Sequence, residues 1–178
     1  LSDESIVEGV LIPSRDRMTA CISSQVGCHL GCKFCATAGL GFKRNLYSDE
    51  IVDQVVEIDR IAQEQYQQSL SNIVYMGMGE PLMNIPNVSD SVRWLTSEQG
   101  LGISYKRITL STVGLADQIK KLADEDLKIN LALSLHVANN EKRNKIVPIN
   151  RRNPIEDLID AVQYFYEKTK LRITIEYI

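Results

Sequence analysis

The cysteines of this chain are confined to one short segment. All four lie between positions 21 and 35, and the last three, Cys28, Cys32 and Cys35, follow the spacing C-x3-C-x2-C. Three thiols within eight residues are too close together for a useful disulfide framework, and one of the three would stay unpaired. Thiolates are soft ligands that select zinc, copper(I) or iron–sulfur clusters. The spacing therefore indicates a metal site on a single loop.

The number of ligands narrows the choice of metal. Structural zinc sites commonly use two pairs of ligands that are well separated in sequence, and no second pair occurs here. His29 lies inside the triplet, but its ligation beside Cys28 would be geometrically awkward, and His136 is the only other histidine. Three cysteines on one loop suit a four-iron cluster that leaves one iron open to a substrate. Zinc, or a loop of free thiols, is the alternative.

The elements that must position these thiols alternate between strand and helix patterns. Apolar or β-branched runs predict five strands, at residues 18–24, 73–76, 108–113, 129–135 and 173–178. Apolar residues at helical spacing predict four helices between them, around residues 51–58, 88–95, 115–122 and 155–166. Ser48 is predicted to cap the first helix and Asn153 the last, with Pro154 at the first helical position. This alternation predicts a parallel sheet with right-handed crossovers.

Polar residues recur where the predicted strands end. The cysteines follow the first strand, GMGEP (77–81) follows the second, Ser111 and Thr112 come late in the third, and Ser134 and His136 late in the fourth. A doubly wound sheet would divide such residues around one switch point, whereas a (β/α) barrel opens all its strand ends onto one face. We therefore predict an α/β fold, a partial (β/α) barrel, in one domain spanning residues 1–178. The strand pattern that reaches the last residue predicts a truncated barrel.

Composition sets limits on compartment and partners. With 178 residues, 44% of them hydrophobic, the chain is long and apolar enough for a single core without disulfides. It lacks an apolar run of the roughly 20 residues that cross a bilayer, and its acidic N-terminus lacks a signal pattern. We therefore expect a cytoplasmic protein with no membrane partner.

Charge is distributed unevenly along the chain. The net charge of −3 argues against a generally basic nucleic-acid binder. One segment, residues 141–153, nevertheless carries five basic side chains and a single acid; the basic residues are Lys142, Arg143, Lys145, Arg151 and Arg152. Such a patch could meet phosphates, although an ordinary solvated loop would have the same composition.

Taken together, the motifs resemble a known family. The cysteine triplet, with Phe34 before its last cysteine, resembles the radical S-adenosylmethionine (SAM) superfamily. The strings CISSQVGCHLGCKFCATAGLGFKRNL, MGMGEPLMN, RITLSTVG, LALSLH and KIVPINRR resemble one family within it, the bacterial adenine-C2 methyltransferases of 23S ribosomal RNA, which also act on certain transfer RNAs. The resemblance runs from about Glu8 to Ile178. It implies a radical SAM core domain without that family's N-terminal helical domain and last barrel strand.

The resemblance also implies a cofactor site. Cys28, Cys32 and Cys35 would hold a [4Fe-4S] cluster, whose open iron would bind SAM. Gly79 and Glu80 would hold the methionine end of SAM. The residues implied to line the rest of the SAM pocket are Ser111, Ser134, Leu135 and His136. By itself, a Ser or His at a strand end is more often a satisfied structural group.

Two further residues gain a role only through the resemblance. Cys21 matches a cysteine that resolves the protein–RNA adduct, and Glu8 matches an acid that handles protons at the substrate. Taken alone, Cys21 is a small buried strand residue and Glu8 an exposed carboxylate. The cysteine that carries the methyl group in this family is absent, because no cysteine follows Cys35. We therefore expect cofactor binding without complete methyl transfer.

The implied partners are 23S ribosomal RNA, transfer RNA and an electron donor such as flavodoxin. Two alternatives stay open. One is the sister family that methylates carbon 8 of the same adenine, against which Pro81 is a slight indication. The other is a non-catalytic RNA-binding module with a structural metal.

Overall fold

The computed structural model describes residues 1–177 and contains a six-stranded sheet and a separate two-stranded sheet. In the larger sheet, with strand order β1-β2-β5-β6-β7-β8, five strands are parallel and only the edge strand β1 runs antiparallel to its neighbour. Its strands are β1 (Val10–Ser14), β2 (Arg17–Cys21), β5 (Asn72–Tyr75), β6 (Ile108–Thr112), β7 (Asn130–Ser134) and β8 (Ile173–Glu176). The smaller sheet pairs β3 (Gln25–Gly27) with β4 (Phe42–Asn45).

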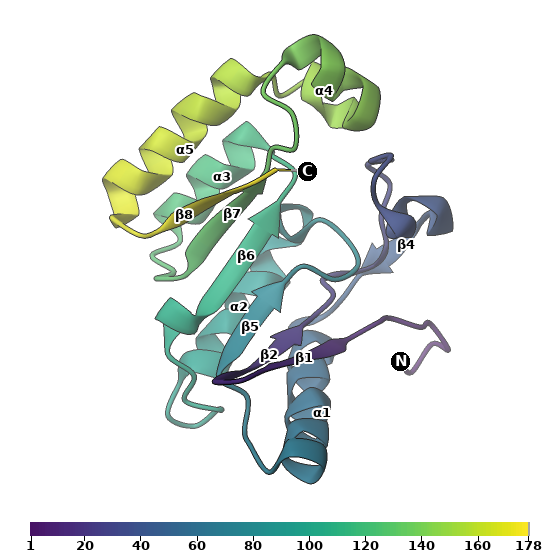
Figure 1. Cartoon of the computed structure of the whole chain (residues 1–178), viewed down its shortest axis with the longest axis vertical. Helices are drawn as coiled ribbons and strands as arrows, with labels where there is room; N and C mark the ends of the chain where they lie inside the picture. Colours follow the sequence, from purple (N-terminus) through teal and green to yellow (C-terminus); the bar gives the residue numbers. More distant parts are fainter. Residues whose placement is uncertain (178) are drawn as a thin grey trace.

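Five α-helices accompany the strands of the described chain. They are α1 (Ser48–Tyr66), α2 (Ile85–Thr96), α3 (Ala116–Asp124), α4 (Asn140–Ile146) and α5 (Ile155–Thr169). Four 3-10 turns complete the regular structure: η1 (Ala36–Leu40), η2 (Pro81–Met83), η3 (Tyr105–Arg107) and η4 (Pro148–Arg151). Helix α3 packs against α5, and α1 packs against α2. Figure 1 shows the arrowheads of the parallel strands pointing toward the end of the sheet where α4 lies.

Strand alternation divides the sheet into an apolar face and a more polar one. Ile73 pairs with Ile108, Tyr75 pairs with Leu110, and these side chains are fully or almost fully buried. Because side chains alternate along a strand, Ser111 lies on the opposite face from Leu110. Ser134 lies opposite Leu133 in the same way. The buried face holds the core under the helices, and the other face leaves room for polar chemistry.

The predicted fold class is confirmed. All five predicted strands occur as the parallel strands of the large sheet, and the sheet of the described residues is open, with β1 and β8 as its edges. The first strand ends at Cys21 rather than at residue 24, although Ile22 N–H still donates to Val74 O on β5 at 3.0 Å. Residue 178, the last of the predicted fifth strand, lies outside the described residues. Strands β1, β3 and β4 were not predicted, since they lack a regular apolar alternation. No helix within residues 1–177 combines the length and apolarity needed to cross a membrane.

Two predicted helix caps are wrong by one residue. Tyr47 is the N-cap of α1, and Ser48 is already the first helical residue. Pro154 is the N-cap of α5 and not its first helical residue, which is Ile155. The side chain of Asn153 serves a different helix: its Oδ1 accepts a 2.8 Å hydrogen bond from the N–H of Ala116, at the start of α3. A side chain that caps a distant helix cannot be recognised from its own sequence neighbours.

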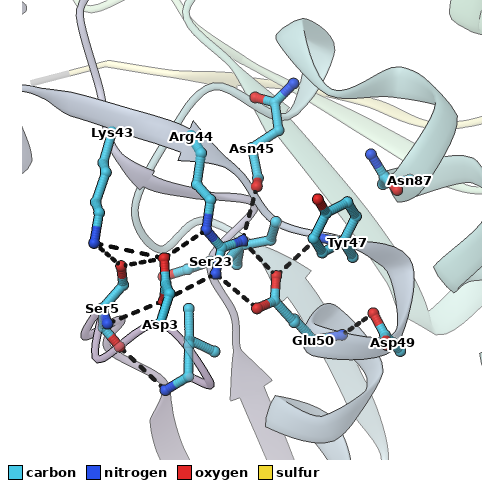
Figure 2. A network of polar contacts seen from close by, with 12 residues as sticks. Asp3, Ser5, Ser23, Lys43, Arg44, Asn45, Tyr47, Asp49, Glu50 and Asn87 are labelled. Atoms are coloured by element: carbon cyan, nitrogen blue, oxygen red, sulfur yellow. Dashed lines mark hydrogen bonds and ion pairs between the residues drawn. The ribbon is translucent and has the colours of Figure 1, made fainter.

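The first residues of the chain are fastened to the β3–β4 hairpin. Figure 2 shows the guanidinium of Arg44 between two carboxylates, those of Asp3 and Glu50. Arg44 Nη1 donates to Glu50 Oε2 at 2.7 Å, and Arg44 Nε donates to Asp3 Oδ2 at 3.0 Å. Hydrogen bonds from Arg44 hold the pKa of both carboxyl groups below their usual values. This network anchors β4, the strand that follows the cysteine loop, which is the connection of residues 28–41 between β3 and β4.

Candidate functional site

A cavity of about 450 Å³ opens where the parallel strands end. Eight of the residues singled out from the sequence line it together: Cys28, Cys32, Cys35, Gly79, Glu80, Ser111, Ser134 and His136. They come from the cysteine loop and from the ends of strands β5, β6 and β7. Parallel strands end on the same side of a sheet, which is why residues up to 108 positions apart, such as Cys28 and His136, share one cavity.

The cysteine loop is closed at its base by two glycines. Gly27 has a φ of 76°, and a Cβ at this position would lie 1.8 Å from the carbonyl oxygen of Gly41. That close approach lets Cys28 N–H donate to the same Gly41 oxygen at 2.8 Å. The loop is also docked on α4, since Lys33 N–H donates to Ile146 O at 2.9 Å. The thiols are therefore presented by a loop tied at its base and at its middle.

The three thiols lie in an apolar setting. Cys32 is buried and packs with Leu30, Val113 and Val147, while Cys28 and Cys35 pack at the edge of the same group. Burial, together with the proximity of the other two cysteines, raises the pKa of Cys32 to about 12. Burial also raises the pKa of Cys28. Such thiols stay neutral near pH 7 unless a bound cation stabilises the thiolates.

This donor set fits an iron–sulfur cluster. Three soft sulfur ligands line one cavity, and the same cavity has further room beside them for a small molecule. Across residues 1–177, no three His, Cys, Asp or Glu side chains are arranged to hold a single metal ion. The fit therefore rests on the number of thiols, their spacing and their shared cavity.

The GMGEP segment needs glycine at two positions. A Cβ at Gly77 would lie 2.7 Å from the backbone carbon of Ile22. Gly79 has a φ of 96°, and a Cβ there would lie 2.4 Å from the Cβ of Gln25. The segment is thus pressed against the chain that leads into the cysteine loop, with Gly79 on the cavity wall.

Glu80 is a buried carboxylate, 4% exposed, that is held by backbone groups. Its Oε2 accepts from Val113 N–H at 3.0 Å, and its Oε1 accepts from Leu82 N–H at 3.1 Å. Burial raises the pKa of Glu80, and the hydrogen bonds oppose that rise. The carboxylate ties the end of β6 to the turn η2, so part of its acceptor capacity is already used by the fold.

Ser111 and Ser134 share a carboxylate that the sequence analysis did not single out. Their hydroxyls lie 3.2 Å apart and donate to Glu176 Oε2, at 3.0 Å from Ser111 and 2.6 Å from Ser134. Glu176 also lines the cavity. The sequence carried a signal, because Glu176 is the only charged residue in the run predicted as the fifth strand, ITIEYI (173–178). The three side chains form a polar row across β6, β7 and β8.

His136 combines burial, an unusual backbone conformation and unused polar atoms. Its φ is 58°, a left-handed value that only a few per cent of non-glycine residues adopt. The side chain is 6% exposed, and within residues 1–177 neither ring nitrogen has a hydrogen-bond partner. Its ring packs edge-to-face on Phe34, with centroids 4.2 Å apart. Burial lowers the pKa of His136, so the ring presents a neutral donor and acceptor to the cavity.

Arg143 is not part of a surface patch, which corrects its place among the five basic residues of the predicted patch at residues 141–153. It lies on α4, capped by Asn139, whose side chain accepts from Lys142 N–H at 3.0 Å. Arg143 is 0% exposed. Its neighbours differ: Lys145 pairs with Glu141, and Lys142, Arg151 and Arg152 are exposed. The pattern of charges alone could not show which basic side chain turns inward.

Three residues singled out from the sequence lie outside the cavity lining in the described structure. Cys21 ends β2 and is half-buried, and burial raises the pKa of its thiol. Glu8 is exposed, and its backbone oxygen accepts from Ser23 Oγ at 2.8 Å. Leu135 contributes its backbone oxygen to Arg143. The structure therefore separates these three from the eight residues that it brings together.

Comparison with known proteins identifies the class. Residues 22–177 match the family model described as the radical SAM superfamily. The chain belongs to this superfamily. Membership implies SAM and a [4Fe-4S] cluster, which the three thiols and the adjoining cavity fit.

The relatives within that class are more specific. The chain is 58% identical over 178 residues to a protein of Christiangramia forsetii named "Probable dual-specificity RNA methyltransferase RlmN", covering 100% of this chain and 51% of the relative. A Flavobacterium psychrophilum protein of the same name is 55% identical with the same coverage. A crystal structure of a radical SAM methyltransferase from Sphaerobacter thermophilus is 46% identical, with a TM-score of 0.92 over 96% of this chain and 50% of that one. The chain thus spans about half the length of the curated relatives it matches.

Proposed function

We propose that this chain is the cofactor-binding core of a radical SAM RNA methyltransferase that modifies carbon 2 of an adenine in 23S ribosomal RNA, with transfer RNA as a second substrate. One observation supports this most strongly: three thiols and the polar strand ends share a single cavity in a chain 58% identical to a named RNA methyltransferase. Action on ribosomal RNA would place the protein in the cytoplasm, with a flavodoxin-like electron donor.

The cysteine loop would hold the cluster. Cys28, Cys32 and Cys35 would ligate a [4Fe-4S] cluster, which when bound supplies the electron for reductive cleavage of SAM. The apolar packing of Cys32 against Val113 and Val147 would exclude water from that side of the site.

The strand ends would hold SAM. The backbone at Gly79 and Glu80 would face the methionine end, because both residues line the cavity and a buried carboxylate favours an ammonium group nearby. The row formed by Ser111, Ser134 and Glu176 offers acceptors and donors for hydroxyl or amino groups. His136 and the backbone at Leu135 would complete the pocket, with the unpartnered imidazole nitrogens of His136 free for the cofactor.

RNA would approach the same end of the sheet. The segment comprising α4 and η4 is docked on the cysteine loop and carries the exposed Lys142, Arg151 and Arg152. These side chains would bind phosphates, so RNA binding should weaken steeply as the salt concentration is raised.

Cys21 would resolve the protein–RNA adduct and Glu8 would move a proton at the base. The methyl-carrying thiol would not come from residues 1–178, since no cysteine follows Cys35 in this sequence.

Reductive cleavage of SAM tests the cofactor core directly. After anaerobic reconstitution with iron and sulfide, addition of dithionite and SAM should yield 5′-deoxyadenosine and methionine. Cys28→Ser should abolish both products, whereas Cys21→Ser, outside the cavity, should leave them unchanged. A protein that takes up zinc instead, or a cluster that leaves SAM intact, would contradict the proposal and favour a non-catalytic RNA-binding module.

The modified position needs a separate experiment. Cells that lack their own enzyme should be complemented with the full-length protein, and the nucleosides of 23S ribosomal RNA and transfer RNA analysed by mass spectrometry. The proposal predicts 2-methyladenosine in both RNAs. The appearance of 8-methyladenosine alone would assign the protein to the sister family.

A further inference from the structure

Arg143 carries a buried positive charge without an acidic partner. Its Nε donates to Leu135 O at 3.0 Å and its Nη2 donates to Ser134 O at 3.1 Å. The remaining bonds go to Val113 O and to the side-chain oxygen of Asn150. Every acceptor is a neutral oxygen, and no ion pair to Arg143 occurs within residues 1–177. Buried charges are normally paired, so this guanidinium calls for an explanation.

The location of Arg143 suggests what its charge faces. Two of its acceptors, Val113 and Ser134, also line the cavity that contains the cysteines. Val113 belongs to the same buried apolar cluster as Cys32. The helix that carries Arg143 accepts a hydrogen bond from the cysteine loop, between Lys33 N–H and Ile146 O. The buried cation therefore lies under the wall on which the thiols are held.

The oxygens that accept hydrogen bonds from Arg143 do not by themselves require a positively charged donor. Carbonyl and amide oxygens can be satisfied by neutral donors such as backbone N–H or a glutamine amide. The hydrogen bonds of Arg143 stabilise the docking of α4, but they do not remove the cost of burying a permanent charge, which falls when negative charge lies nearby. In a cavity with three thiolates around a [4Fe-4S] cluster the net charge is negative, and it becomes more negative when the cluster gains an electron.

We infer that Arg143 is a positioning and counter-charge residue for the cluster: its guanidinium offsets the negative charge of the thiolate-bound cluster and favours the one-electron reduced form. The inference rests on the proposed function, because it needs the cluster to be present. The electron comes from the external donor, and Arg143 keeps its proton throughout. A purely structural role, which ties α4 to the ends of β6 and β7, is the alternative.

Redox titration monitored by electron paramagnetic resonance separates the two roles. Arg143→Gln removes the charge and keeps a hydrogen-bond donor. At a fixed potential, the ratio of reduced to oxidised cluster should fall by roughly tenfold, which is about 59 mV in the midpoint potential of a one-electron couple. Arg143→Lys, which keeps the charge, should stay close to the unsubstituted protein in potential even if it is less stable.

A second variant keeps the experiment decisive if Arg143→Gln does not fold. Asn150→Asp leaves the guanidinium in place and puts a carboxylate against it, since Asn150 Oδ1 already accepts from Arg143 Nη1. The midpoint potential should shift in the same direction as in Arg143→Gln. Lys142→Gln is the matched control, because it removes a positive charge from the same helix at an exposed, solvent-screened position. Its potential should not move.

The outcomes distinguish this inference from the proposed function. A cluster whose potential falls in Arg143→Gln or Asn150→Asp, but not in Lys142→Gln, supports the counter-charge role. A cluster that forms and cleaves SAM with the same potential in every variant overturns the inference and leaves the proposed function intact. Failure of the unsubstituted protein to assemble any iron–sulfur cluster overturns both.

Discussion

Two arginines lie on the elements next to the cysteine loop, and their surroundings differ in exposure and in the charge of their partners. Arg44, on β4, lies between the carboxylates of Asp3 and Glu50 near the surface (Figure 2). Arg143, on α4, is fully buried and contacts only neutral oxygens within residues 1–177. The first is a self-contained ion network. The second has no carboxylate partner among the described residues, and in the role inferred above its charge would be balanced by a cluster bound in the cavity.

The largest expected effect is on the Arg143 side. In the absence of cofactors, Arg143→Gln should lower the free energy of unfolding by about 3 kcal/mol, because several buried carbonyls lose their donor. Urea denaturation of the cofactor-free protein measures it. A loss smaller than about 1 kcal/mol would mean that these hydrogen bonds contribute little, and the contrast with Arg44 would disappear.

A smaller effect is expected at the glycine that shapes the cavity wall. Gly79→Ala should lower the free energy of unfolding by about 2 kcal/mol, since the φ of 96° disfavours alanine and its Cβ would meet Gln25 at 2.4 Å. It should also weaken SAM binding. Gly39→Ala is the matched control in the cysteine loop, because no atom lies within 4 Å of its added Cβ. Equal stability of the two variants would show that the cavity wall shifts to accept a methyl group at Gly79 without cost.

The Arg44 side should respond less to substitution and more to salt. Arg44→Ala should lower the free energy of unfolding by about 1 kcal/mol or less, because the network is partly exposed to solvent. The difference from the unsubstituted protein should shrink as salt is raised from low to molar concentration. The corresponding loss for Arg143→Gln should be nearly independent of salt. Equal salt dependence of the two variants would contradict the comparison.

The smallest expected effect is a dependence on pH. The pKa values of Asp3 and Glu50 are lowered in the folded protein, chiefly by hydrogen bonds from Arg44. The unfolded chain therefore binds protons first, so the stability contributed by these groups is present above pH of about 4 and is lost as the pH falls further. Denaturation midpoints between pH 7 and pH 3 should show a steeper acid loss in the unsubstituted protein than in Arg44→Ala. Parallel curves would refute the assignment.

The sequence predicted the parallel strands and the position of the site better than it predicted the tertiary contacts of single side chains. The five parallel strands and the meeting of their polar ends followed from apolar runs and from residues such as Ser111 and Ser134, because these depend on local pattern. Glu176 could have been found as the only charged residue of the fifth apolar run. The burial of Arg143 could not, because it depends on how α4 docks against strands distant in sequence. The cap provided by Asn153 to α3 has the same origin in tertiary contact.

In the proposed function the three clustered thiols, and not Cys21, would build a cluster site that is open to SAM. The most direct measurement is electron paramagnetic resonance of the anaerobically reconstituted, reduced protein, with and without SAM. The unsubstituted protein and Cys21→Ser should both show a [4Fe-4S] signal that changes when SAM is added, and Cys32→Ser should show none. A signal that survives in Cys32→Ser would show that Cys32 is not a cluster ligand, and one that SAM does not change would show that the cluster has no iron open to SAM.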